Sequence, residues 1–197
     1  MLRTFKRAVM VGMLVAGAAG CAAPQYGPPR VVVQGDKFSD DVTILGVQVL
    51  VNPLMDFEKE HWYLRSFVNP KAQRVRHQLY AELIYTDGRN GAYFAADNHA
   101  RPYRVDLIYS EGCGRHAAND VCIRQDTVGI DIPEATLRAE AAQGFEMKIS
   151  ARSGYAVILS VTPEMINAQL YATQQILSGA VVVGQTVQSG GTIQAAP

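Results

Sequence analysis

The sequence predicts a mainly β fold, an antiparallel β-sandwich of immunoglobulin-like general architecture with two short helices. Between residues 42 and 161, apolar side chains alternate with polar ones more often than they recur at helical spacing, which is typical of half-buried strands. Turn signals that contain Gly, Pro, Asn or Asp separate about seven or eight such segments. Only two segments carry the start and stop signals of a helix. A partly closed β-barrel is the alternative architecture.

The first half of this region contains the longest predicted strand. Residues 42–50 are rich in β-branched residues, and residues 62–68 lead into a turn at Asn69-Pro70-Lys71, so both segments are predicted strands. Residues 74–85 alternate strictly and predict a long central strand. One face of that strand carries Val75, His77, Leu79, Ala81, Leu83 and Tyr85.

The following segments predict hairpins. Asp87-Gly88 and Asn90-Gly91 tolerate positive φ, so we expect residues 92–96 to pair back on the central strand. A later hairpin is expected within residues 145–161, around Ser153-Gly154. Two further strands are expected to present Tyr103, Val105, Leu107 and Tyr109 on one face, and Val128, Ile130 and Ile132 on another.

The two helices are predicted from their terminal residues. The first begins at Pro133, continues through an alanine-rich stretch and ends at Gly144, because Pro suits a first turn and Gly suits the residue after a helix. The second starts with Thr162 as N-cap and Pro163 in the first turn and runs to about Leu177.

The N-terminal residues have the pattern of a signal peptide. Residues 1–7 carry three basic residues and no acid, and residues 8–20 are uncharged and mostly apolar. The apolar stretch has 13 residues, whereas a helix that crosses a bilayer needs roughly 20. We therefore expect residues 1–20 to be removed as a signal peptide.

The remaining chain is expected to have three parts. Residues 21–41 begin with several prolines, which favour an extended tether. Residues 42–177 are the predicted β domain. Residues 178–197 are rich in Gly, Gln, Ser, Thr and Ala, and are expected to form a flexible C-terminal tail.

The segment Ala18-Ala19-Gly20-Cys21 resembles the lipobox of bacterial lipoproteins. The resemblance implies that Cys21 receives a diacylglyceryl group, becomes the N-terminus of the mature protein and carries an acyl chain such as palmitate. Ala22 stands where family members that stay in the inner membrane often have Asp. The resemblance therefore implies attachment to the outer membrane, at its periplasmic face, in a Gram-negative host. Cleavage by ordinary signal peptidase after Ala16-Gly17-Ala18, which releases a soluble protein, is the alternative.

With Cys21 assigned to lipid, Cys113 and Cys122 remain as a pair. An exported protein meets an oxidising compartment, so the two are expected to form a disulfide. They lie in a turn-rich stretch with Gly112 and Gly114, which is flexible enough to bring the sulfur atoms together. Closing so short a loop stabilises the fold by roughly 2 to 3 kcal/mol in the chain-entropy model.

The same stretch, residues 110–115, is similar to the S-H-G-C-x-R segment of L,D-transpeptidases, periplasmic enzymes that crosslink peptidoglycan through a cysteine thiolate. The resemblance implies Cys113 as the nucleophile, with Arg115 nearby. Glu111 occupies the place of the family's histidine, and an acid there opposes formation of the thiolate. Cys122 also offers Cys113 a disulfide partner. A structural disulfide is therefore preferred to a catalytic thiol.

Other binding chemistry receives little support from the sequence. Loss of the signal peptide leaves a formal charge of −3 with scattered charges, so nucleic acid is excluded as a partner. The four histidines have no metal-ligand spacing, and no metal or cofactor is predicted. They are His61, His77, His99 and His116. The strand-region tyrosines Tyr80, Tyr85, Tyr93, Tyr103 and Tyr109 fit either sheet packing, which is preferred, or a recognition surface.

These patterns favour a non-enzymatic protein of the bacterial envelope. An anchor, a tether and one β domain suit a binding or assembly module held near an envelope protein, because tethering raises the effective concentration of a partner. A cell-wall enzyme of L,D-transpeptidase type that uses Cys113 is the alternative.

The lipobox resemblance makes a direct prediction for Cys21. Cys21→Ser should move the protein from washed membranes into the soluble fraction, because each buried acyl CH₂ contributes about 0.8 kcal/mol to membrane binding. Fractionation and mass spectrometry of the mature N-terminus measure this. An unmodified N-terminus in the wild type, or a Cys21→Ser protein that stays with the membranes, contradicts the prediction.

Overall fold

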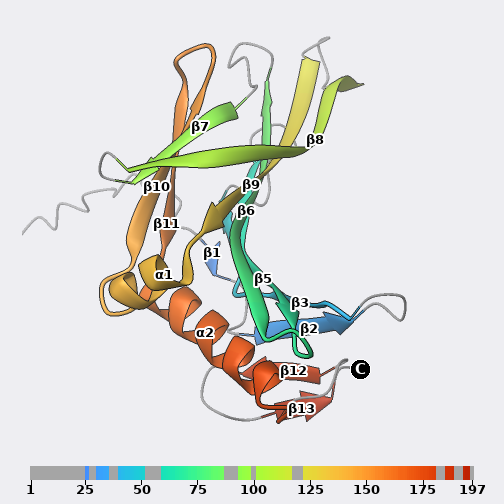
Figure 1. Cartoon of the computed structure of the whole chain (residues 1–197). Helices are drawn as coiled ribbons and strands as arrows, with labels where there is room; N and C mark the ends of the chain where they lie inside the picture. The colour runs from blue at the N-terminus through green and yellow to red at the C-terminus, as the bar shows by residue number, and fades with distance from the viewer. Residues whose placement is uncertain are drawn as a thin grey trace, which may run out of the picture.

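The computed structural model describes residues 25–26, 30–35, 40–51, 59–86, 93–98, 101–116, 122–180, 185–188 and 193–195. Over these residues the chain consists of antiparallel strands and two helices (Figure 1). The predicted mainly β, antiparallel fold with two short helices is therefore confirmed. The signal peptide and Cys21 lie outside the described residues.

The elements follow one another in a simple order. The strands before the first helix are β1 (Gln25–Tyr26), β2 (Arg30–Gly35), β3 (Val42–Leu45), β4 (Val49–Val51), β5 (Lys59–Asn69), β6 (Arg74–Thr86), β7 (Tyr93–Asn98), β8 (Arg101–His116) and β9 (Cys122–Ile132). They are followed by α1 (Glu134–Glu140), β10 (Phe145–Ala151), β11 (Ala156–Val161), α2 (Pro163–Leu177), β12 (Gln185–Gln188) and β13 (Ile193–Ala195). Both helices and the β10–β11 hairpin lie where the sequence predicts them.

The strands form one continuous, curled sheet. Their order is β11-β10-β7-β8-β9-β6-β5-β3-β2-β12-β13, and β4 pairs with both β5 and β1. The path bends so that the β10–β11 hairpin returns toward β5 (Figure 1). There the indole N–H of Trp62 on β5 donates a 2.9 Å hydrogen bond to the carbonyl of Ser160 on β11. This curled sheet has the shape of a half-barrel and so matches the alternative architecture, the partly closed barrel.

The core lies between the concave face of this sheet and α2. Pairing of β5 with β6 places Leu64 opposite Leu79, and β9 places Ile130 opposite Leu79 from the other side. All three side chains are fully buried. The predicted buried face of β6 is confirmed, since His77, Leu79, Ala81, Leu83 and Tyr85 are buried and Val75 is partly buried. Val128, Ile130 and Ile132 of β9 are buried as predicted.

Helix α2 starts and ends at the predicted signals. The hydroxyl of Thr162 accepts a 3.3 Å hydrogen bond from the N–H of Met165, which caps the first turn. Gly179 follows the helix with a φ of 72°, a conformation that Gly adopts without strain. Its buried side carries Met165, Ile166, Ala168, Gln169, Ala172, Thr173 and Ile176. Leu170 and Leu177 are only partly buried.

The structure corrects the predicted hairpin after the central strand. Residues 93–98 form β7, but β7 pairs with β8 and β10 and not with β6. The two edges of β6 are already occupied, because β5 pairs along one edge and β9 along the other. The turn signals at residues 87–91 lie outside the described residues.

Two predicted strands contain an interruption. Residues 42–50 form β3 and β4, separated at Gly46, whose N–H donates to the carbonyl of Leu64 at 2.8 Å. In β8, Leu107 pairs with Val128 and Tyr109 pairs with Thr127, so Ile108 is the extra residue of a β-bulge. Leu107 and Tyr109 therefore point to opposite faces, and the shared face predicted for them is wrong.

The folded domain extends beyond both predicted boundaries. β2 lies within the predicted tether, pairs with β3 and buries Val31 and Val33. β12 and β13 lie within the predicted tail, and β12 pairs with β2. Val31 and Val33 give β2 an apolar face, so this segment adds to the sheet although prolines precede it. Strand pairing therefore continues into both segments that flank residues 42–177.

The Trp62 hydrogen bond gives a stability prediction. Trp62→Phe should destabilise the fold by about 1 to 3 kcal/mol, because it removes the donor and leaves the carbonyl of Ser160 without this partner. Urea unfolding at constant temperature measures the change. Tyr171→Phe, at an exposed position on α2, is the matched control and should change stability by less than about 0.5 kcal/mol. Equal unfolding curves for Trp62→Phe and the wild type contradict the prediction.

Candidate functional site

The predicted cysteine pair is a disulfide. Cys113 and Cys122 are bonded, with their Cα atoms 4.9 Å apart, within the range for disulfides. The bond joins β8 to β9 at a second bulge, where residues 112–114 lie between the pairs Glu111↔Gln125 and Arg115↔Ile123. Cys113 has a φ of 47°, so the bulge places its backbone in the left-handed region. The disulfide therefore fixes an irregular end of the sheet.

The residues of the transpeptidase-like segment are engaged within the sheet. The hydroxyl of Ser110 donates to the carboxylate of Asp126 at 2.6 Å, and Asp126 also accepts from the hydroxyl of Tyr85 at 2.8 Å. Glu111 accepts from Tyr109 at 3.2 Å. Since the sulfur of Cys113 is in a disulfide, this segment carries no thiolate in the structure. His99 lies outside the described residues.

The second half of β8 has an open edge. Residues 101–104 pair with β7, whereas from Val105 onward the strand pairs only with β9 among the described residues. Leu107, Ile108 and Tyr109 follow on this stretch and are 55%, 45% and 49% exposed. A strand edge beside exposed apolar side chains is a surface to which another extended chain can add.

A buried polar chain joins α2 to the central strands. The amide of Gln169 donates to the carbonyl of Ile44 at 3.3 Å and to the hydroxyl of Ser66 at 2.6 Å. The hydroxyl of Ser66 lies 2.6 Å from Nδ1 of His77. Because Ser66 has one proton, donation to Nδ1 satisfies both groups and leaves the proton of a neutral His77 on Nε2. That nitrogen faces Oε2 of Glu134 at 3.7 Å.

Serine, histidine and glutamate in this order are the residue types of a catalytic triad, but here the serine is not accessible to a substrate. Ser66 is fully buried beneath α2, and a nucleophile has to reach its substrate. The carboxylate of Glu134 is also beyond hydrogen-bond distance of the imidazole. The chain of hydrogen bonds therefore fits a structural role, in which it fixes α2 on β3, β5 and β6.

The outer face of β5 and β6 carries a second cluster, which we call the arginine–aromatic cluster: Tyr63, Arg65, Phe67, Arg76 and Tyr80. The rings of Tyr63 and Tyr80 lie 4.8 Å apart. The guanidinium of Arg65 lies 4.6 Å from the ring centre of Tyr80, and that of Arg76 lies 4.7 Å from the ring centre of Phe67. Cation–π contacts of this kind hold the two arginines against the sheet.

Gln78 connects this cluster to β9. Its side-chain oxygen accepts from both Nε and Nη2 of Arg65, and its amide nitrogen donates to Asp131 at 3.0 Å. Gln78 is only 2% exposed, and it lies over Gly129, where a Cβ atom would come within 2.6 Å of its side-chain atoms. Gly129 therefore makes room for Gln78, which orients Arg65.

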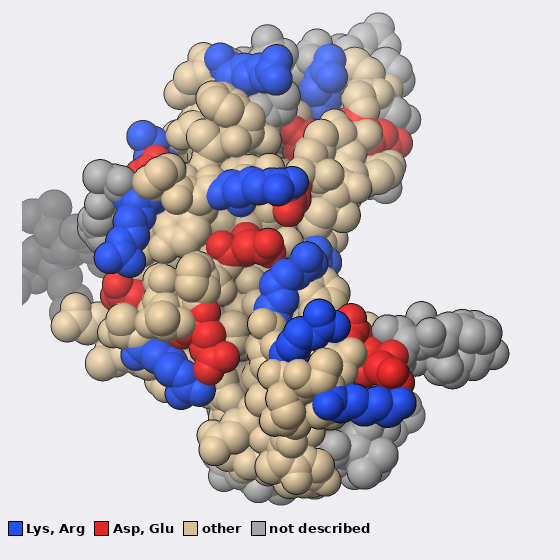
Figure 2. Space-filling model, in the orientation of Figure 1, with Lys and Arg blue, Asp and Glu red and all other residues tan. Residues whose placement is uncertain are grey.

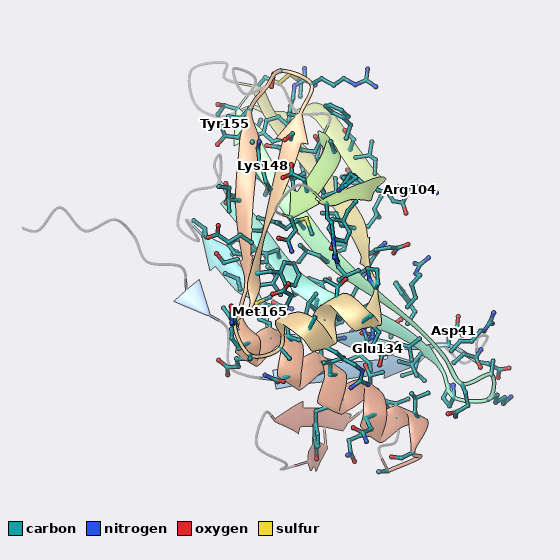
Figure 3. All side chains as sticks on the ribbon, turned by 60° about the vertical axis from the view of Figure 1, so that its left-hand side comes forward. Asp41, Arg104, Glu134, Lys148, Tyr155 and Met165 are labelled. Atoms are coloured by element: carbon teal, nitrogen blue, oxygen red, sulfur yellow. A yellow bond between two sulfur atoms is a disulfide. The ribbon has the colours of Figure 1, made fainter. Side chains whose placement is uncertain are left out.

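A shallow groove lies at the turn end of the β5–β6 hairpin. Its volume is about 380 Å³, and it is lined by Asp41, Phe67, Asn69, Arg74, Val75 and Arg76. We call it the arginine groove. Asn69 donates to Asp41 at 2.7 Å, which fixes one wall of the groove. Figure 2 shows basic and acidic side chains side by side over this part of the molecule, and Figure 3 shows Asp41 beside the turn.

The remaining predicted candidates are distributed over several environments. Tyr85 and Tyr93 are buried and in edge-to-face contact, whereas Tyr80 and Tyr103 are half-buried. His61 lies beside Glu82, with 3.8 Å between Nδ1 and Oε2. The described residues include no group of three His, Cys, Asp or Glu side chains that could hold a metal ion. Sequence reasoning missed the arginine groove, because its residues come from two strands and the loop before β3.

In comparisons with known proteins, no family model, no curated protein and no solved structure matches this chain. The described helices include none that is both long and apolar enough to span a membrane. The candidate sites therefore have to be interpreted from their own geometry and chemistry.

The buried histidine gives a pH prediction. Burial lowers the pKa of His77 below its usual value of 6.5, although Glu134 acts in the opposite direction. The folded protein therefore keeps His77 neutral at a pH where the unfolded chain binds a proton. This contribution to stability is present above about pH 6.5 and is lost as the pH falls below it.

His77→Gln should consequently flatten the decrease in the free energy of unfolding between about pH 7 and pH 5. Urea unfolding at both pH values measures the decrease. His61→Gln is the control, because burial also lowers the pKa of His61 but its side chain is more exposed. It should preserve most of the decrease. A His77→Gln protein with the full pH dependence of the wild type contradicts the prediction.

Proposed function

We propose that the protein is a lipid-anchored periplasmic lipoprotein of the bacterial envelope, and that its β domain is a non-enzymatic binding or assembly module. The observation that carries this proposal is the open edge of β8 with its exposed Leu107, Ile108 and Tyr109. The anchor is proposed at Cys21, in the outer membrane. The partner is an envelope protein that contributes an extended segment to this edge.

The chemistry of the edge supports an extended partner. Added strands gain affinity from backbone hydrogen bonds, and side chains next to the edge provide apolar contact. Proteins usually protect such an edge with charges, prolines or a covering segment, and three consecutive exposed apolar residues are the opposite of that protection. The bulge at Ile108 places Leu107 and Tyr109 on opposite faces of the sheet. An added strand would therefore find an apolar contact on each face.

The disulfide also favours a binding role over the alternative cell-wall enzyme. A cysteine nucleophile acts as a free thiolate, whereas Cys113 is bonded to Cys122. The bond instead holds the far end of β8 on β9. A rigid edge binds an added strand with a smaller loss of conformational entropy than a mobile edge does.

Site-specific photocrosslinking in living cells tests the proposed edge. A crosslinking amino acid at Leu107 or Ile108 should give a discrete adduct with one envelope protein, whereas the same amino acid at exposed Tyr171 on α2 should not. Ile108→Lys, in a protein that carries the crosslinker at Leu107, should weaken formation of the adduct about tenfold or more, since it places a charge in the apolar contact. Equal adducts at Leu107 and Tyr171, or none at β8, contradict the proposal.

A further inference from the structure

The arginine groove contains two guanidinium groups with unused hydrogen-bond donors. The guanidinium of Arg76 is held against the ring of Phe67, and its Nε lies 3.8 Å from Oδ1 of Asp131. The side chain of Arg74 makes no hydrogen bond or ion pair within the described part of the chain. Stacking uses the flat face of a guanidinium and leaves its N–H groups directed outward in the plane. Both arginines can therefore donate to a bound group.

The positive charges of the two arginines favour an anionic ligand, and the planar shape of their guanidinium groups favours a carboxylate. A guanidinium and a carboxylate form paired, charge-assisted hydrogen bonds, which are stronger than hydrogen bonds between neutral groups. Arg74 and Arg76 are two positions apart on β6, so their side chains lie on the same face of the strand. Both can therefore approach one carboxylate. Asp131 forms a 3.8 Å ion pair with Nε of Arg76 and accepts a hydrogen bond from Gln78, so the terminal N–H groups of Arg76 stay available for a ligand.

The opposite wall of the groove has different chemistry. Asp41 carries a carboxylate that Asn69 holds in place, so this wall attracts a positive group and repels a second anion. A compact dianion such as phosphate would meet this repulsion. A volume of about 380 Å³ is also much larger than one small ion requires and lies within the range of small-ligand sites. The groove thus fits a ligand with separated negative and positive ends.

We propose that the arginine groove binds a free dipeptide, with its carboxylate on Arg74 and Arg76 and its amino group directed toward Asp41. This site goes beyond the assembly role proposed for the edge of β8. It lies on β5, β6 and the loop before β3, so either proposal can fail without the other.

Titration of the purified full-length protein in detergent with alanyl-alanine tests the proposal by saturation-transfer NMR. The dipeptide should bind with a dissociation constant below about 10 mM. Its C-terminal amide, which lacks the carboxylate, should bind at least about tenfold more weakly. Its N-acetyl form should lose a smaller factor, about threefold, because the interaction with Asp41 lies in an open groove. Inorganic phosphate should displace the dipeptide less effectively than alanyl-alanine itself does.

Variants of the arginines connect binding to the groove. Arg74→Gln and Arg76→Gln should each weaken binding of the dipeptide about tenfold, and the double variant should abolish it. Arg138→Gln is the matched control, because Arg138 is bound to Glu134 on α1 and lies outside the groove. Thermal unfolding and circular dichroism show whether each variant retains the fold, and Arg74→Lys provides a second, charge-preserving variant.

Four outcomes overturn the proposal. The first is an amidated dipeptide that binds as tightly as the free acid, and the second is a folded double variant that binds like the wild type. The third is a failure of alanyl-alanine to bind below about 10 mM. Stronger binding of inorganic phosphate would assign the groove to a phosphate ligand and would also overturn it.

Discussion

The return of β11 to β5 is the constraint on which the other features depend. Trp62 is only 4% exposed, and its indole N–H reaches the carbonyl of Ser160 across the concave side of the sheet. An open sheet would leave that side in water, whereas this contact encloses it and allows Leu64, Leu79 and Leu159 to be fully buried. The curl also determines what stays uncovered. β8 is longer than β7, so its second half continues past β7 and, within the described part of the chain, pairs only with β9.

Helix α2 covers the part of the concave face that the curl does not enclose, and it does so with a polar residue in the centre. The side-chain nitrogen of Gln169 needs hydrogen-bond acceptors because the residue is fully buried, and Ile44 and Ser66 provide them. Its oxygen also requires space, which Gly46 provides, since a Cβ atom there would lie 2.6 Å from it. One buried polar side chain therefore fixes the position of the helix and explains why β3 and β4 are separate strands.

The sequence predicts elements with strong local signals and misses features that depend on strand neighbours. Alternation identifies β6 and its buried face, and Thr162, Pro163 and Gly144 mark the helix ends. The turn signals after β6 wrongly predict a hairpin with β6. Turn residues specify that the chain reverses, but they do not specify which strand has a free edge for pairing. The bulge at Ile108 is missed because strict alternation assumes constant pairing. The cysteine pair is found by elimination, whereas Arg74 and Arg76 meet Asp41 only through the register of β3, β5 and β6.

The two proposed contacts differ in their physical basis, which affects how an anchored module would use them. Strand addition at β8 depends on backbone groups and tolerates many partner sequences, so it provides affinity with little selectivity. The arginine groove would select by charge at two positions, and Phe67 orients Arg76 before any ligand arrives. In the two proposals, strand addition at β8 would hold a protein partner near the anchored domain, which raises the local concentration of that partner. The groove would instead select a small ligand by the distance between its negative and positive ends, so the two contacts would act on different ligands.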